Sequence, residues 1–405
     1  MNLVFANLGG NALGLAAVLV STWLYSPAAV GGGMALIAAA SLLGTMASLG
    51  LGTGILRFLP EAGVTARQLL VRLTTISALL SVLVGVGFVA GRSIWAENLP
   101  LIDTWAGAAV FVASVSANAL AMLQDGLLLA TRRSGLLSAR TWGAGALRIV
   151  CLLPLVAAGT WGIFASWFAS SGLSTAVAAV RIRVGSSGLH AGPATLPAPP
   201  ATAQVVRFSL ENYAVDLVST IPASLMPLIL IGALGEAPTA YYVVGALAGT
   251  VAATIARGAT VALFAEGSRD QEQIAALSRR AILFAMALLV PVTAAALVLA
   301  EPVLAILGPG YAAEGTWNLR LQVLSALPAT LVMVHLVILR IQGRLRTVFA
   351  ITLLGSVVTV LLASALVESL GVSGGGLAIL AGQLLMASVV ARALTRQLRR
   401  ARTAG

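Results

Sequence analysis

Charged side chains interrupt two neighbouring apolar stretches in the first half of this sequence. Asp125 lies seven residues before Arg132, and Arg148 lies eight residues beyond Arg140, which is about 12 Å along a helix. A charge at the centre of a membrane helix costs about 2.5–3.5 kcal/mol on insertion scales, so it normally faces protein or water. Two roles stay open for Asp125 and Arg148: a buried ion pair with each other, or contact with a substrate.

Polar side chains also form stripes along other apolar stretches. Thr250, Thr254 and Arg257 follow at i, i+4 and i+7, which places them on one face of a helix. Small polar residues of this kind commonly bond neighbouring membrane helices. A role in a substrate or ion path is an equal alternative for the charged members, because an unpaired charge there needs water or a ligand. The other polar residues of this kind are Ser209, Asn212, Asp216 and Ser219 in one stripe, and Asn7 with Asn11 one turn apart near the N-terminus.

Enzyme signatures are scarce in the sequence. It has no metal-ligand spacing, no nucleophile elbow and no phosphate loop, and its two histidines are His190 and His335. His335 lies in an apolar stretch, where a lone histidine is more often a packed, hydrogen-bonded residue than a proton-coupling group. We keep it, with Asp216 and Asp125, as a candidate for ion coupling. The expectation is a transporter rather than an enzyme, with no cofactor and no metal.

One arginine closes a glycine-studded apolar run, LGLGTGILRFLPEAG, at residues 49–63. Arg57 either anchors the end of a spanning helix at the membrane surface or stands where an anionic group enters the protein. The spacing favours anchoring, because Arg57 lies near the end of the run. Gly50, Gly52 and Gly54 precede it and would permit close packing or bending of that helix.

The composition is that of an integral membrane protein. The chain is 59% hydrophobic and 9% charged over 405 residues, with a mean hydropathy of +1.00, which is more apolar than a soluble fold can bury. The net charge of +11 comes from 24 arginines and no lysine. These arginines gather in short loops between apolar stretches, so they indicate topology and no nucleic-acid partner. The single cysteine, Cys151, cannot form an intrachain disulfide.

Twelve stretches are long and apolar enough to span a bilayer, which takes about 20 residues each. A Pro/Gly-rich segment divides them into six and six, which predicts an N-terminal lobe over residues 1–183, a cytoplasmic linker over 184–206 and a C-terminal lobe over 207–405. The predicted spans are 3–25, 29–56, 69–91, 105–130, 137–158, 161–180, 208–233, 239–264, 280–300, 317–341, 346–367 and 373–395.

Arginines occupy alternate loops, and the opposite loops are mainly acidic. Arg132 and Arg133 follow the fourth span, for example, whereas Asp103 precedes it. With an even number of spans, this bias places both termini in the cytoplasm. The arginine, alanine and glycine bias points to a bacterial protein and hence to the plasma membrane.

The two halves carry weak internal matches at similar offsets of 206, 212 and 208 residues: Phe58 with Phe264, Trp105 with Trp317, and Gly135 with Gly343. Parallel repeats that meet near the membrane centre are a transporter architecture. We therefore expect an all-α membrane protein whose twelve transmembrane helices form two six-helix bundles related by a pseudo-twofold repeat.

This pattern resembles a known family. Six plus six spans, LGLGTGILRFLPEAG after the second span, ILGPGYAAEG after the ninth and RIQGRLR after the tenth resemble the polysaccharide-flippase (Wzx-like) branch of the multidrug, oligosaccharidyl-lipid and polysaccharide exporter superfamily. The resemblance implies a flippase that moves undecaprenyl-diphosphate-linked oligosaccharide across the plasma membrane by alternating access. The partners it implies are that lipid, membrane lipids, and the glycosyltransferases and polymerase of cell-surface polysaccharide synthesis.

The resemblance also implies roles for particular residues. Arginines that meet the diphosphate would be Arg57, Arg257 and, less directly, Arg148, since guanidinium forks match phosphate oxygens. Asn7, Asn11 and Asn212 would complete the substrate site. One alternative is ion-coupled drug or metabolite efflux on the same fold, which the absence of a carboxylate from residues 3–25 disfavours. The other is a membrane-embedded polysaccharide polymerase or ligase, which would need a larger outward loop than this sequence offers.

Overall fold

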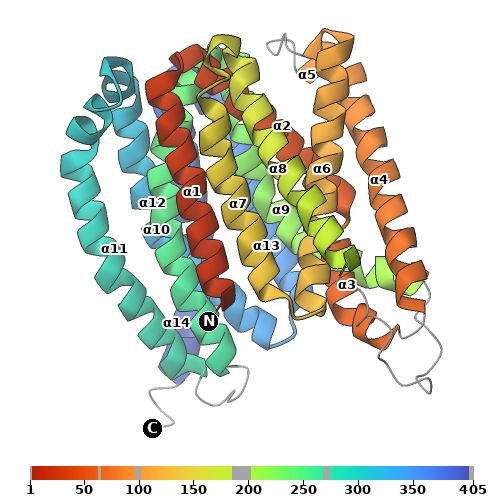
Figure 1. The fold of residues 1–405 in the computed structure, drawn as a ribbon. Coiled ribbons are helices and arrows are strands. Elements are labelled where there is room, and N and C mark those ends of the chain that lie inside the picture. The colour runs from red at the N-terminus through yellow and green to blue at the C-terminus, as the bar shows by residue number, and fades with distance from the viewer. Residues whose placement is uncertain (1, 63–64, 96–101, 185–201, 268–273, 401–405) are drawn as a thin grey trace. The chain divides into compact units, whose positions relative to one another are not determined.

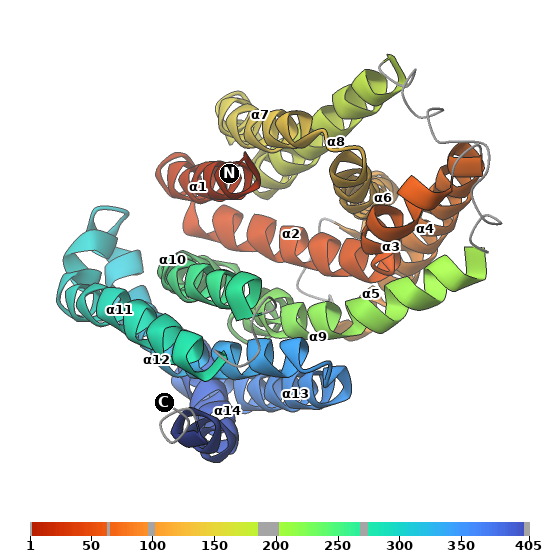
Figure 2. The same cartoon turned by 90° about the horizontal axis from the view of Figure 1, so that it is seen from below.

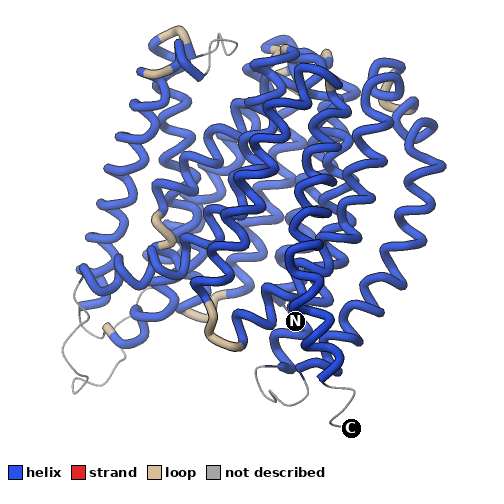
Figure 3. The backbone as a smooth tube through the Cα atoms, turned by 180° about the vertical axis from the view of Figure 1, so that it is seen from behind, coloured by secondary structure: helices blue, strands red, loops and turns tan. Residues whose placement is uncertain are grey.

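The computed structural model describes residues 2–62, 65–95, 102–184, 202–267 and 274–400 of the chain. Helices make up nearly all of these residues, and short turns join many of them (Figures 1 and 3). In chain order they are α1 (Asn2–Leu24), α2 (Pro27–Ser48), α3 (Leu51–Phe58), η1 (Leu59–Glu61), α4 (Ala66–Ala90), α5 (Arg92–Trp95), α6 (Trp105–Ala130), α7 (Ser134–Leu152), η4 (Val156–Ala158), α8 (Thr160–Val184), α9 (Thr202–Leu234), α10 (Glu236–Gly267), α11 (Ile274–Ala305), α12 (Pro309–Ile341), α13 (Leu345–Leu370) and α14 (Val372–Arg400).

The prediction of an all-helical membrane protein with twelve spans is confirmed. Within the described ranges, ten helices are long and apolar enough to cross a membrane. The other two long helices are α1, whose apolar part is Ala12–Leu24, and α7. The α7 helix has 19 residues, about 28 Å of rise, and Arg140 and Arg148 lower its hydropathy.

The second predicted span, residues 29–56, is not one helix. The α2 helix ends at Ser48, and α3 begins at Leu51. Leu49 and Gly50 between them both have left-handed backbone angles, with φ of 47° and 65°. Two consecutive residues in this conformation interrupt the α-helical hydrogen-bond pattern. Arg57 therefore sits on a separate short helix.

Packing divides the chain into two compact units, Met1–Thr220 and Ile221–Gly405. The dividing point lies inside α9, so residues 207–220 pack with the first unit, whereas we expected the second lobe to begin at residue 207. The reason is local contact between the start of α9 and α3: Tyr213 lies against Gly50, and Ser209 lies against Gly54. The core of the predicted linker, 185–201, falls outside the described residues.

Glycines bring helices of the first unit into close contact. A Cβ atom added to Gly33 of α2 would lie 2.7 Å from Ile163 of α8, and one added to Gly145 of α7 would lie 2.6 Å from Leu13 of α1. Such distances leave no room for a side chain, so these small residues set the spacing of the helices. Neighbouring α7 and α8 can be followed in Figure 2.

In the second unit, α12 packs against α10 and α14. Two buried amides of α12 cross to α10: Asn318 donates to the Tyr242 carbonyl oxygen (2.9 Å), and Gln322 donates to the Tyr242 hydroxyl oxygen (2.9 Å). Gly245 and Gly376 make room for Asn318 on either side. Buried polar groups in apolar surroundings need such partners, so these bonds fix how α12 and α10 pack.

Candidate functional site

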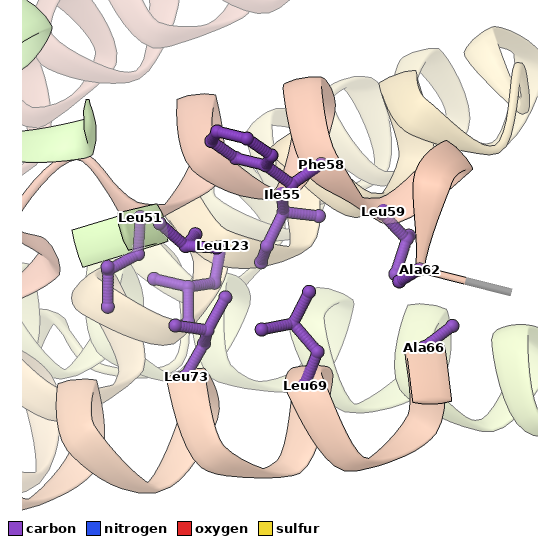
Figure 4. Packing of buried hydrophobic residues seen from close by; sticks show 10 residues of the cluster. Leu51, Ile55, Phe58, Leu59, Ala62, Ala66, Leu69, Leu73 and Leu123 are labelled. Atoms are coloured by element: carbon purple, nitrogen blue, oxygen red, sulfur yellow. The ribbon is translucent and has the colours of Figure 1, made fainter. Parts of the chain in front are cut away.

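Arg57 lies in the last turn of α3, on the face turned away from the core. The opposite face buries Leu51, Ile55 and Phe58, which pack with residues of α4 and α6 (Figure 4). The Arg57 side chain is exposed, and its guanidinium carbon lies 5.6 Å from the centre of the Phe58 ring, a cation–π distance. A guanidinium in this position is accessible to an anionic group.

Three glycines hold α3 between its neighbours. A Cβ atom on Gly52 would lie 2.7 Å from the Met122 carbonyl oxygen of α6. A Cβ atom on Gly50 or Gly54 would collide with Tyr213 or Ser209 of α9. The expected close packing at all three glycines is thus present, and Gly50 also supplies the bend.

Asp125 forms an ion pair and hydrogen bond with Arg140, not with Arg148. The Arg140 side chain is largely buried, 11% exposed, whereas that of Asp125 is 40% exposed. Because eight residues rotate a helix by about 80° beyond two full turns, Arg148 points in a different direction from Arg140. The alternative of an Asp125–Arg148 pair is therefore wrong.

Arg148 lies deeper along α7, over the ring of Trp167 on α8. Its guanidinium carbon is 5.6 Å from the ring centre, and its buried Nε–H meets no hydrogen-bond acceptor within the described part of the chain. No carboxylate among the described residues forms a salt bridge with it. A desolvated guanidinium with one donor unused can still bind an anionic or carbonyl oxygen.

The polar stripe of α10 lies in the second unit. Arg257 and Thr250 are exposed, and Thr254 is half-buried. The two threonine hydroxyls bond within their own helix: Thr250 donates to the Ala246 oxygen (3.0 Å), and Thr254 donates to the Thr250 oxygen (2.9 Å). The interhelical bonds considered for these threonines are therefore not the ones observed, and Arg257 remains the chemically distinctive member of the stripe.

The remaining candidates divide between the two units. Asp216 is exposed on the part of α9 that belongs to the first unit, and His335 is buried on α12, 4% exposed, in the second. Ser209 and Ser219 donate to carbonyls of their own helix, as the threonines of α10 do. The side chains of Asn7, Asn11 and Asn212 fall outside the described residues.

Two polar residues of the first unit were not singled out from the sequence. Gln124 donates from α6 to the Thr175 carbonyl oxygen of α8 (2.9 Å). The signal for Gln124 was available, since it is a polar residue in the same apolar stretch as Asp125. Tyr213 donates its hydroxyl to the Thr45 carbonyl oxygen of α2. Tyr213 could not be identified from the sequence, because its partner is a backbone carbonyl and every residue has one.

The order and lengths of these helices define a multi-pass, all-helical membrane fold, and several solved structures share that fold. The solved structure of lipid II flippase MurJ in an inward closed conformation shares this fold at TM-score 0.79 and 10% identity, over 98% of this chain and 89% of that chain. A multidrug resistance MATE family transporter of the MOP superfamily, inward-facing, matches at TM-score 0.73 and 16% identity, over 97% and 96%. A mutant MATE transporter of Vibrio cholerae matches at TM-score 0.62 and 15% identity, over 98% and 95%.

At the sequence level, neither a protein-family model nor a curated protein matches the chain. The likeness to the solved structures is therefore one of fold. The fold is that expected for the superfamily that the sequence pattern resembles.

Proposed function

We propose that the chain is a bacterial plasma-membrane flippase that moves polyprenyl-diphosphate-linked oligosaccharide to the outer leaflet by alternating access. The polyprenyl tail would stay in the bilayer while the diphosphate and sugars pass through the protein. Both termini would lie in the cytoplasm. The flipped lipid would supply cell-surface polysaccharide synthesis, with glycosyltransferases before this step and a polymerase after it.

The charge balance of the first unit carries this proposal. Asp125 is the one acidic residue in the long helices that lie wholly within this unit, α1, α2, α4, α6, α7 and α8, and Arg140 neutralises it; the part of α9 in this unit adds Asp216. Arg148 has no such carboxylate among the described residues. A surplus of positive charge within apolar helices favours an anionic substrate and disfavours a cationic drug.

Guanidinium groups match the chemistry of the proposed head group. A diphosphate offers paired oxygens that an arginine can bind in a bidentate manner. Arg57 and Arg257, both exposed, are the proposed primary contacts, and Arg148 is a third. Asn7, Asn11 and Asn212 are proposed as further substrate contacts, and Asp216, His335 and Asp125 are the candidates for ion coupling.

The second candidate function is ion-coupled drug or metabolite efflux. The observation in its favour is the likeness of fold to MATE transporters, one of which is described as a multidrug resistance transporter. Drug efflux needs carboxylates that face a cationic substrate; in the first unit Asp125 is paired with Arg140, which leaves Asp216 of α9 as the described carboxylate that could serve it. The two functions therefore differ in the charge of the substrate.

Reconstituted protein in liposomes can separate the two functions. A fluorescent polyprenyl-diphosphate oligosaccharide is used as one substrate and ethidium as the other, with the Arg57→Ala and Arg257→Ala variants beside the parent protein. Arg344→Ala is the matched control, because Arg344 is exposed in the turn before α13. Loss of a charge-assisted hydrogen bond should slow head-group flipping about tenfold or more in the first two variants, and the control should flip at the parent rate.

The outcome that contradicts the proposal is equally specific. Ethidium transport by the parent protein without flipping of the lipid would establish efflux instead. Flipping that is unchanged in both arginine variants would remove the proposed diphosphate contacts.

A further inference from the structure

The break between α2 and α3 deprives the Thr45 carbonyl of the backbone N–H that would bond it in a continuous helix. In an α-helix the N–H of residue 49 would bond the carbonyl of residue 45. Here the Leu49 N–H donates to the Met46 oxygen instead (3.2 Å). The Thr45 oxygen accepts the Ser48 hydroxyl (2.8 Å). A buried carbonyl at a helix end needs partners of this kind.

A second hydroxyl reaches the same oxygen from another helix. Tyr213 of α9 donates to Thr45 O across 168 residues of sequence. Its side chain is buried, and a Cβ atom on Gly50 would lie 2.3 Å from the Tyr213 Cβ atom. Tyr213 therefore both bonds the last turn of α2 and touches the left-handed glycine that turns the chain into α3.

We propose that Tyr213 is a positioning residue that holds the break in its bent form and thereby fixes the orientation of α3. The carbonyl bond stabilises the state in which α2 has ended, and the contact with Gly50 sets the angle at which α3 departs. Arg57 lies two turns farther along α3, so its guanidinium position follows from that angle. The inference rests on the proposed function only for the role of Arg57 toward a diphosphate.

The position of α9 in the chain gives the contact between Tyr213 and Gly50 a wider effect. Residues 202–220 of α9 pack with the first unit, and the helix continues without interruption into the second unit at Ile221. Tyr213 is thus on the covalent path between the units. A change in α9 reaches the α2–α3 junction through the Tyr213 hydrogen bond to α2 and the Tyr213–Gly50 contact, and it reaches α3 also through the Ser209–Gly54 contact.

Electron paramagnetic resonance distances test the inference directly. Spin labels are placed on the full-length protein in a Cys151→Ala background, at Thr53→Cys on α3 and Ala113→Cys on α6, both exposed positions. Tyr213→Phe removes only the hydroxyl and should shift or broaden the distance distribution, because a lost hydrogen bond changes an equilibrium about three- to tenfold. Gly50→Ala, which perturbs the same contact from the other side, should shift it too.

The control is another tyrosine that bonds a helix-end carbonyl. Tyr25 donates to the Leu152 oxygen (2.6 Å), far along the chain from α3, so Tyr25→Phe should leave the α3 distances as in the parent. Distances in Tyr213→Phe that match the parent would overturn the inference.

Binding of farnesyl diphosphate, measured by fluorescence titration, separates the inference from the proposed function. A dissociation constant about three- to tenfold higher in Tyr213→Phe, with no change in Tyr25→Phe, supports both. A shifted α3 with unchanged diphosphate binding supports the positioning role and contradicts the contact assigned to Arg57.

Discussion

At the scale of single residues, the ion pair between Arg140 and Asp125 is unequal in its exposure. Arg140 is largely buried and Asp125 is partly exposed. Removing the Asp125 carboxylate therefore leaves the Arg140 guanidinium charge unpaired where water reaches it poorly. We predict that Asp125→Ala lowers the stability of the protein by about 1–3 kcal/mol, between the values for exposed and fully buried pairs. Thermal unfolding of the purified protein in detergent measures this loss.

A double variant shows whether the unpaired Arg140 charge causes the loss of stability. Arg140→Met in the Asp125→Ala background replaces the guanidinium by an apolar side chain of similar length, and it should restore much of the stability. Losses that simply add in the double variant would mean that the two residues do not depend on each other.

Sequence alone could locate these residues but not their partners. A charge in an apolar stretch is visible, and its depth follows from the rise per residue. Which of Arg140 and Arg148 faces Asp125 depends on how α6 and α7 are rotated about their axes, and hydropathy does not specify rotation where several faces are apolar. The tyrosine bonds to backbone carbonyls were beyond prediction for a related reason, since any helix end could have received them.

At the scale of elements, the contact between α3 and α6 is a backbone contact. A Cβ atom added to Gly126 of α6 would lie 2.2 Å from the Gly52 carbonyl oxygen, and a backbone atom cannot move aside as a flexible side chain can. We predict that Gly126→Ala destabilises the protein by about 1–3 kcal/mol, measured as a lower midpoint of thermal unfolding.

Gly143→Ala is the matched control for this prediction. Gly143 lies in α7, and an added Cβ atom would meet nothing within 4 Å. Alanine is the better helix former by up to about 1 kcal/mol, so this variant should be as stable as the parent or more so. An equal loss in both variants would contradict the role of the α3–α6 contact.

The elements themselves were largely predictable. A run of about 20 apolar residues must form a closed hydrogen-bond pattern in lipid, so it becomes a helix, and the span predicted at 105–130 coincides with α6. The break at Leu49 and Gly50 was not predicted. Glycines are common in unbroken membrane helices, and the left-handed residues Leu49 and Gly50 lie beside a contact of Gly50 with Tyr213 of α9 that no local pattern encodes.

At the scale of the whole molecule, the order of twelve spans was predictable and the packing division was not. The Pro/Gly-rich segment before α9 suggested where the halves separate, yet residues 207–220 pack with the first unit. Composition marks a linker, whereas the glycine contacts of α3 decide which helices lie together. The boundary between the two packed units is thus set by close contacts at glycines more than by the polar composition of the linker.

The distribution of arginines predicts which end of each helix faces the cytoplasm. Arg132 and Arg133 lie in the turn after α6, whereas Arg92, at the opposite end, is neutralised by Asp103 through a bond of 2.9 Å. Loops rich in arginine stay on the cytoplasmic side, so the turn between α6 and α7 should be cytoplasmic and η4 should face outward. Cysteines at two exposed positions, Gly135 and Ala157, in a Cys151→Ala background test this with a membrane-impermeant maleimide. We predict that intact spheroplasts label Ala157→Cys and that Gly135→Cys reacts only after permeabilisation, while the reverse pattern would invert the proposed direction of transport as well as the topology.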